Sequence, residues 1–348
     1  LFITLSIIRL QSERTKRSVP QNSLRYGGVI LMTLVIGYLS ARPVLRWYYD
    51  ATEMKDNTLT QKSIDVMKKL DGPLTITTYI NMLDEDYFRG MPRYYNEDFE
   101  RFEKFVRFKP EMKLKYVYYY DKVQNSSLDR RYPGLSDEER LAKICEVEEW
   151  DVKDILTPEE IHKIEDLSGE YNKFARVIER GNGQKSILRI YDDNMRHPSE
   201  TEITAAFKRM VIKSPMVAFL EGHGERSING AGDRDYYAFS RYKAFRNSLV
   251  NQGFDNMTLC LDSLDRIPEN VDILVISDVR TPLSEKEQVI IENYIAQGRN
   301  LLIAGEPRRQ EQMNAIIAPL GLAFLPGLLV QESKDYPADL ILSKATHA

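Results

Sequence analysis

The chain has 348 residues, of which 43% are hydrophobic, and its formal net charge is −4. These values are typical of globular protein, and the length leaves room for a membrane span and two medium domains. Charge is uneven along the chain: residues 1–49 hold 7 basic and 1 acidic residue, so residues 50–348 hold 41 basic and 51 acidic residues, a net charge of −10. This acidic balance argues against nucleic-acid binding, which depends on basic surfaces that neutralise phosphate.

Residues 26–41 are sixteen uncharged residues and predict a transmembrane helix. A bilayer core needs roughly 20 residues, and the apolar and aromatic residues up to Tyr49 extend the run, so we expect the span over 26–49. Arg42 and Arg46 would reach the far interface. Residues 9–25 contain five basic residues against Glu13 and predict a cytoplasmic loop, which places the chain from residue 50 onward in the periplasm, anchored to the inner (cytoplasmic) membrane.

Two other interpretations of this run stay open. It could be a buried helix of a soluble protein, or the apolar core of a cleaved signal peptide with a cleavage site at Leu39-Ser-Ala41. Residues 1–8 are apolar and begin without Met. They resemble the end of an earlier transmembrane helix, which indicates a piece of a longer polytopic protein.

Residues 50–215 predict a first α/β lobe. Strands are expected over 74–80 and 113–120 around a helix over 97–108, after a helix over 61–70; this βαβ unit favours a parallel sheet. A mainly helical insertion, resembling a lid, is expected over about 122–183, with a capping box at Thr157 and Glu160 that starts a helix running to about Leu167. A strand over 186–191 and a helix over 199–210 follow, and Gly181-Asn-Gly183 is a hairpin signal.

Residues 216–348 predict a second α/β lobe, of the flavodoxin type, with a doubly wound, mainly parallel sheet. Apolar runs indicate strands at 216–220, 257–261, 272–277 and 300–304. Helices are expected over 235–251, closed by Gly253, and over 284–297, where Ser284 and Glu287 form a capping box. The runs do not alternate, as expected when helices cover both faces of a sheet.

The loop over residues 221–234 is the strongest candidate for a binding site, because ligands of open α/β sheets lie outside the carboxyl ends of the strands. Glycines let backbone N–H groups approach an anion, and His and carboxylate side chains could coordinate a metal or move protons. The alternatives are a solvated turn or a docking surface. A single His is weak evidence for zinc, so we predict no metal, no cofactor and no catalytic residue. The candidate ligand-binding residues are Glu221, Gly222, His223, Gly224, Glu225 and Arg226.

Other chemistry finds little support in the sequence. No P-loop sequence is present, which excludes nucleotide binding of that kind. Cys145 and Cys260 could form one disulfide, but we expect both thiols to be free and one or both to be buried. Cys260 is expected inside a strand, which argues against a nucleophile.

Several motifs in order resemble GldG, the gliding-motility-associated auxiliary component of an ABC transporter. They are Asn57-Thr-Leu-Thr-Gln-Lys-Ser63, Leu70-Asp-Gly-Pro-Leu-Thr-Ile76, Phe219-Leu-Glu-Gly-His-Gly-Glu225, Val271-Asp-Ile-Leu-Val-Ile276, Leu283-Ser-Glu-Lys-Glu287 and Tyr294-Ile-Ala-Gln-Gly-Arg-Asn300. The resemblance covers about residue 50 to the end. It implies a transport accessory without an ATPase centre, beside a permease and a separate ATPase subunit; the permease can be fused ahead of it. The C-terminal anchor helix of the family does not follow residue 344, so we expect truncation.

The leading hypothesis is therefore a membrane-anchored extracytoplasmic auxiliary subunit that acts through protein contacts or by handling a polar substrate. The alternative is an extracytoplasmic hydrolase or amidotransferase-like enzyme that uses the loop around His223 and Glu225. A third hypothesis, a solute-binding receptor, predicts a deep cleft between the two lobes.

Overall fold

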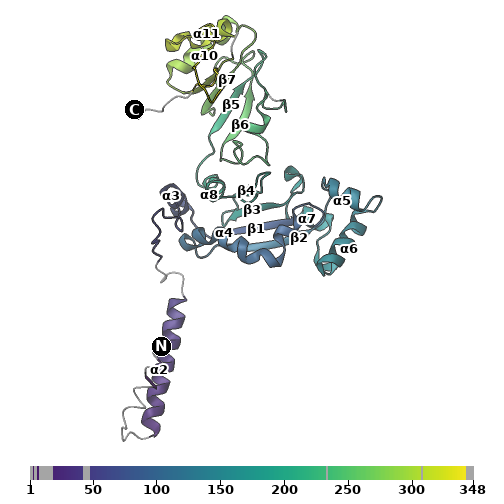
Figure 1. The fold of residues 1–348 in the computed structure, drawn as a ribbon, viewed down its shortest axis with the longest axis vertical. Helices are drawn as coiled ribbons and strands as arrows, with labels where there is room; N and C mark the ends of the chain where they lie inside the picture. The colour runs from purple at the N-terminus through teal and green to yellow at the C-terminus, as the bar shows by residue number, and fades with distance from the viewer. Residues whose placement is uncertain are drawn as a thin grey trace.

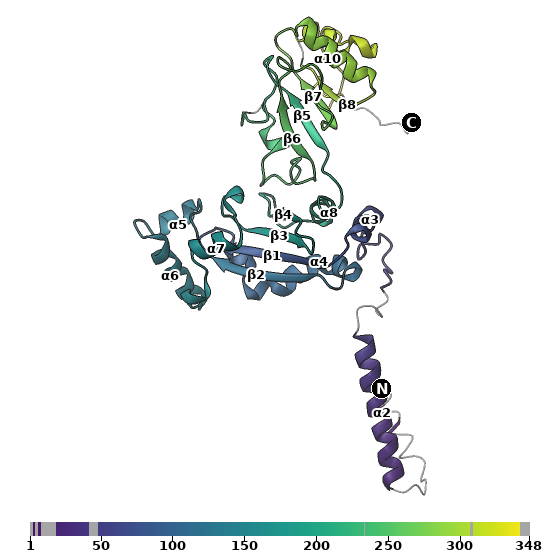
Figure 2. The ribbon, with the colours of Figure 1, turned by 180° about the vertical axis from the view of Figure 1, so that it is seen from behind.

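The computed structural model describes residues 3, 6, 7, 19–41, 48–232, 234–306 and 309–341. Helix α2 (Val19–Ser40) projects away from the two lobes (Figures 1 and 2). Its window Ser23–Ser40 has a mean hydropathy of 1.3, and none of it is buried, so the helix could cross a membrane or serve as a signal sequence. At about 1.5 Å per residue, its 22 residues are about as long as a bilayer core of roughly 30 Å is thick.

The bounds of this helix differ from the expected span over 26–49. The helix begins at Val19, so that Arg25 belongs to it and not to a loop, and Tyr48 and Tyr49 are not helical. Residues 9–18, Arg42 and Arg46 lie outside the described residues, as do most of residues 1–8. The basic cytoplasmic loop and the preceding helix therefore stay predictions.

The first lobe (residues 50–215) is built on a mixed four-stranded sheet with the order β2-β1-β3-β4. Its strands are β1 (Leu74–Asn81), β2 (Lys113–Tyr119), β3 (Ala175–Arg180) and β4 (Lys185–Arg189). Strands β1 and β2 are parallel, as the βαβ pattern predicts, whereas β3 is antiparallel to both β1 and β4.

Three helices cover one face of this sheet: α3 (Gln61–Lys69), α4 (Tyr95–Phe108) and α8 (Glu200–Lys208). Phe102 and Phe105 of α4 and Phe207 of α8 are almost completely buried against the sheet. The amphipathic pattern of α4 produces this packing, because residues three or four positions apart share one side of a helix. All three helices were predicted from the sequence within a few residues at each end.

The expected insertion over 122–183 is only partly helical. It contains α5 (Ser126–Arg131), α6 (Asp137–Glu148) and α7 (Pro158–Ile164). Thr157 and Glu160 form the predicted capping box, although α7 ends before Leu167. The expectation fails at β3, which is a central strand of the sheet. The sequence does not predict this strand because it contains the charged Arg176 and Glu179. The hairpin predicted at 181–183 connects β3 to β4.

The second lobe (residues 216–341) has a four-stranded sheet that is parallel throughout, with the order β6-β5-β7-β8. Its elements are β5 (Met216–Leu220), β6 (Asp255–Leu259), β7 (Ile273–Ser277), β8 (Asn300–Ala304), α9 (Tyr237–Ser240), α10 (Glu285–Ala296) and α11 (Gln310–Ile317). The chain moves from β5 to one neighbour, β6, and then crosses to the other, β7. The carboxyl ends of β5 and β7 therefore form a topological switch point.

The predicted helix over 235–251 is wrong, since only α9 is helical there. Residues 241–252 form successive turns instead. The side chain of Asn251 donates to the carbonyl oxygens of Lys243 and Phe245, both at 2.8 Å. The guanidinium of Arg246 lies between Asp193 and Glu202 of the first lobe. Tertiary hydrogen bonds thus replace those of a helix, and Gly253 still ends the segment with a positive φ of 86°.

Ion pairs and hydrogen bonds join the lobes along this same segment. Arg209 of the first lobe is 2.7 Å from Asp255, and its guanidinium also donates to Phe254 O at 2.6 Å. Lys243 lies 3.1 Å from Glu170.

Short 3₁₀ turns complete the described chain at Tyr87–Gly90, Pro92–Tyr94, Val152–Asp154, Ser168–Glu170 and Ala318–Leu320.

Candidate functional site

The loop after β5 lies where the sequence places it, at the carboxyl edge of the parallel sheet (Figure 1). His223 is only 8% exposed. Its carbonyl oxygen accepts hydrogen bonds from the backbone N–H groups of Arg280 and Thr281, at 2.9 and 3.1 Å. These bonds hold the β5 loop against the segment that follows β7, so this part of the loop is a fixed structure and not a solvated turn.

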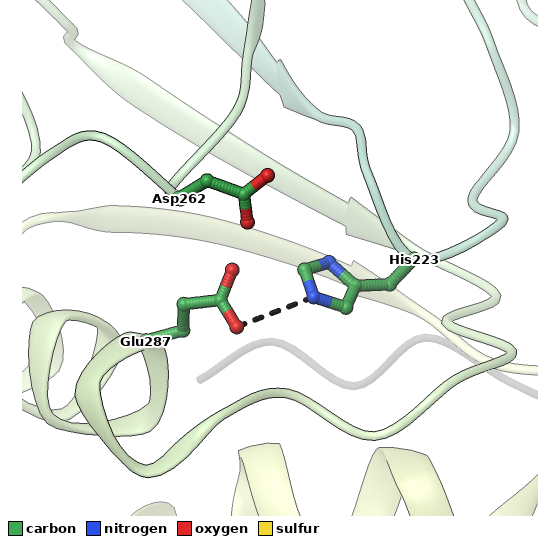
Figure 3. Close-up of side chains that lie close together, drawn as sticks. All are labelled: His223, Asp262 and Glu287. Carbon is green, nitrogen blue, oxygen red and sulfur yellow. Dashed lines mark ion pairs between the residues drawn. The ribbon is translucent and has the colours of Figure 1, made fainter.

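Carboxylates lie on both sides of the His223 ring. Its Nε2 is 3.2 Å from Oε2 of Glu287, and its Nδ1 is 3.5 Å from Oε1 of Glu225 (Figure 3 shows the first pair). Asp262 faces the same point, so that one ligand atom each of His223, Asp262 and Glu287 lies within 4.8 Å of the others. The three residues come from the loop after β5, the turn after β6 and the first turn of α10.

Glu287 has two roles in this arrangement. Its Oε2 accepts hydrogen bonds from the backbone N–H and the hydroxyl of Ser284, at 2.8 and 2.7 Å, which completes the predicted capping box. Its Oε1 is buried and has no hydrogen-bond partner among the described residues. Burial raises the pKa of Glu287, but the Ser284 hydrogen bonds and the charge of His223 outweigh burial and hold the pKa below its ordinary value.

The structure separates the six candidate residues into three groups. His223 and Glu225 belong to the cluster, and the Glu225 carboxylate also accepts the backbone N–H of His223 at 2.6 Å. Glu221 instead accepts the hydroxyl of Ser227, at 2.9 Å, and Arg226 pairs with Glu306.

Gly222 and Gly224 shape the loop. Both have positive φ, at 128° and 76°. A Cβ on Gly224 would lie 3.1 Å from Cβ of Arg280, so this position also needs the small residue.

Sequence reasoning missed Asp262 and Glu287 as site residues. Glu287 was interpreted only as part of a capping box. Asp262 follows β6 by three positions, and the rule that ligands lie at the carboxyl ends of strands could have identified it. Together the donors are one imidazole and three carboxylates, a set that suits a cation or proton exchange better than an anion.

The second lobe is similar to a known protein family. Residues 214–328 match the model of a family described as an ABC-type uncharacterized transport system. No curated protein and no solved structure matches the chain. The match supports an auxiliary component of an ABC transport system and does not extend to the GldG group within it.

The two cysteines of the chain are free, as expected. Cys145 is buried in the first lobe, and burial raises the pKa of its thiol. Cys260 is exposed and stands directly after β6, not inside a strand as predicted. A position inside a strand therefore does not argue against Cys260 as a nucleophile.

A hollow of about 920 Å³ lies between the lobes, where a solute-binding receptor would have its cleft. Each basic side chain in its wall contacts an acidic or amide partner of the protein itself. The hydrogen-bond donors are therefore already engaged within the protein, although Glu170 is shared by Arg189 and Lys243 and the amide of Asn256 does not neutralise Arg241. These basic residues are Lys185, Arg189, Arg209, Arg241 and Lys243.

Proposed function

We propose that the chain is a membrane-anchored, GldG-like auxiliary subunit of an ABC transporter without ATPase activity of its own. The observation that carries the proposal is the family match over the second lobe. Helix α2 supports an anchor, because its apolar surface is unburied and its length suits a bilayer. The basic flank of this helix supports an extracytoplasmic, periplasmic position for both lobes at the inner membrane.

In this proposal the lobes act through protein contacts with the permease, or handle a polar substrate beside it, while a separate subunit hydrolyses ATP. The enzyme alternative uses the His223 and Glu225 side chains. In the structure these two side chains face each other, and the Glu225 side chain is only 1% exposed, so neither is presented to a large substrate. The geometry therefore favours the transport accessory over the hydrolase.

The topology can be tested with the natural cysteines. Cys260 is exposed and Cys145 is 2% exposed, so a membrane-impermeant maleimide should label Cys260 alone in folded protein. We expect labelling in right-side-out membrane vesicles and none in inside-out vesicles, with Cys260→Ser as the unlabelled control. Labelling only in inside-out vesicles would overturn the orientation.

Partners can be tested by affinity purification from native membranes followed by mass spectrometry. We expect an ABC permease and an ATPase subunit to copurify in fixed ratio. Loss of glycan or amide hydrolysis in a His223→Ala/Glu225→Ala variant that still copurifies with the permease would instead favour the enzyme.

A further inference from the structure

We propose that His223, Asp262 and Glu287 bind one divalent transition-metal cation, of the zinc or manganese class, at the switch point of the second lobe. The inference goes beyond the proposed function, and either can fail without the other. It rests on the convergence of three potential ligand atoms within 4.8 Å, from three separate segments of the chain (Figure 3).

The charges at this point call for a cation. The Asp262 and Glu287 carboxylates face each other, and like charges this close disfavour one another. Glu287 is 4% exposed, and its Oε1 has no hydrogen-bond partner in the described part of the chain. A buried carboxylate oxygen without a donor is costly, and a bound cation would satisfy it.

The N-terminus of α10, which is the positive end of the helix dipole, would repel a cation bound at Glu287. That end corresponds to about half an elementary charge, whereas Asp262 and Glu287 supply two full negative charges. The net field of the cluster therefore still attracts a cation.

Glu225 would position the imidazole ligand. Its Oε1 lies 3.5 Å from Nδ1 of His223, on the side of the ring away from Glu287. A carboxylate near one ring nitrogen favours a proton there and leaves the other nitrogen, here Nε2, free to bind a metal. The backbone hydrogen bond from His223 to Glu225 holds the two residues together.

The donor set selects the class of metal. Calcium and magnesium prefer oxygen ligands alone, whereas an imidazole beside two carboxylates suits Zn²⁺ or Mn²⁺. Three protein ligands leave at least one coordination position for water or a substrate group, as in catalytic zinc sites. Asp262 is exposed and would give the ion access from solvent.

The competing explanation is structural. A protonated His223 could bridge Glu225 and Glu287 as an ion pair and simply tie the loops together. This explanation gives Asp262 no more than a hydrogen bond with Glu287 and predicts no metal, so the effect of Asp262 on metal binding distinguishes the two.

The experiment uses the full chain in detergent, stripped of metal with a chelator and titrated with ZnCl₂ or MnCl₂ by calorimetry, with stoichiometry checked by native mass spectrometry. We expect one equivalent to bind to the wild-type protein. Asp262→Asn should weaken binding at least about tenfold, because it removes a direct ligand. Asp265→Asn is the matched control, since Asp265 is 94% exposed, pairs with Lys286 and lies outside the cluster.

Equal affinities of wild-type, Asp262→Asn and Asp265→Asn proteins, or no binding by the wild-type protein, would overturn the site. His223→Gln gives a second test through another ligand, with near-UV circular dichroism to confirm folding. For Glu225→Gln, we expect retained stoichiometry but a shifted visible absorption of the Co²⁺-loaded protein, which a merely structural role would not produce. We expect the side of the membrane on which Cys260 is labelled to be the same in every variant, so failure of the metal site is separate from failure of the proposed function.

Discussion

The two lobes use buried charge differently. In the first lobe, the fully buried Arg176 lies 2.5 Å from Asp98, and its guanidinium lies over the rings of Phe102 and Phe174. In the second lobe, His223 and Glu287 are also buried, but the charges are not matched one to one: a single imidazole faces the carboxylates of Glu225 and Glu287, with Asp262 at the same point. A buried ion pair with one charge of each sign indicates a structural role, whereas several carboxylates around one imidazole indicate a site for a cation.

Sheet topology explains why the incomplete cluster is in the second lobe. All four strands of that sheet run in the same direction, so the loops after β5, β6 and β7 meet at one edge. In the first lobe, β3 runs against β1, and the carboxyl ends of the strands are divided between two edges. A parallel sheet therefore gathers polar side chains that a mixed sheet separates.

The largest expected effect is in the first lobe. Asp98→Asn leaves Arg176 buried without its counter-charge and should destabilise the lobe by about 3–5 kcal/mol. Hydrogen exchange of strands β1 and β3 in urea measures this loss. Glu146→Gln, which breaks the exposed pair with Lys143, is the control and should cost at most about 1 kcal/mol. Equal losses in the two variants would show that the buried pair is not special.

The contact between the lobes should give the next largest effect. Arg246 donates to Asp193 at 2.6 Å and to Glu202 at 2.7 Å. Arg246→Met removes these charged hydrogen bonds and should weaken the contact by about 2–3 kcal/mol, because both carboxylates lose a partner. Limited proteolysis of the linker before β5 should then be faster. Arg266→Met, from an exposed pair with Glu269, should leave the cleavage rate unchanged.

A buried acid of the first lobe should make stability depend on pH. Burial raises the pKa of Asp84 to about 6, although its carboxylate accepts the Phe174 N–H at 2.9 Å. Because the folded-state pKa is above the ordinary value of 3.8, ionised Asp84 destabilises the fold above pH 6. This destabilisation disappears as the pH falls from about 6 to 4. Asp84→Asn should therefore add about 3 kcal/mol at pH 7.5 and nothing at pH 3.5.

Thermal melts across this pH range measure the difference between wild-type and Asp84→Asn proteins. The difference between the two proteins isolates the effect of Asp84 from that of His197. Burial lowers the pKa of His197 to about 3, so His197 makes the fold less stable as the pH falls below 6.5 in both proteins. Glu85→Gln, at an exposed neighbouring position, is the control. A gain that persists at pH 3.5 would contradict the assignment.

The smallest effects come from the helix caps, one in each lobe. Ser284→Ala and Thr157→Ala each remove a capping box and should cost about 1 kcal/mol, measured by hydrogen exchange of α10 and α7. Only Ser284→Ala also removes a hydrogen bond to Oε2 of Glu287, which keeps the backbone N–H donor of residue 284. That variant alone should change zinc affinity. If Ser284→Ala and Thr157→Ala changed zinc affinity equally, the Ser284 cap would have no part in the metal site.

Local signals were sufficient for much of the fold. Capping boxes at Thr157 and Ser284 and the period of the apolar residues predicted α7, α10 and the strands of the second lobe. Strand β3 escaped prediction because Arg176 is charged yet buried, and its partner Asp98 lies 78 positions earlier in the chain. The helix expected over 235–251 failed for the same kind of reason, since its side chains bond to the first lobe.

Half of the candidate site was likewise within reach of the sequence. The residues His223 and Glu225 were found because they follow a predicted strand in a loop rich in glycine. Asp262 and Glu287 join them only through the crossover order of β5, β6 and β7, which brings separate segments to one edge.

The amino-acid sequence by itself determined the apolar helix, its basic flank and the alternation of strands and helices, because these depend on residues a few positions apart. Only the tertiary structure decided which charges are neutralised inside the protein and which remain available to a ligand. The outcome depends on distances between side chains that are far apart in the chain. It also depends on burial, which strengthens electrostatic interactions and makes a charge without a partner more costly.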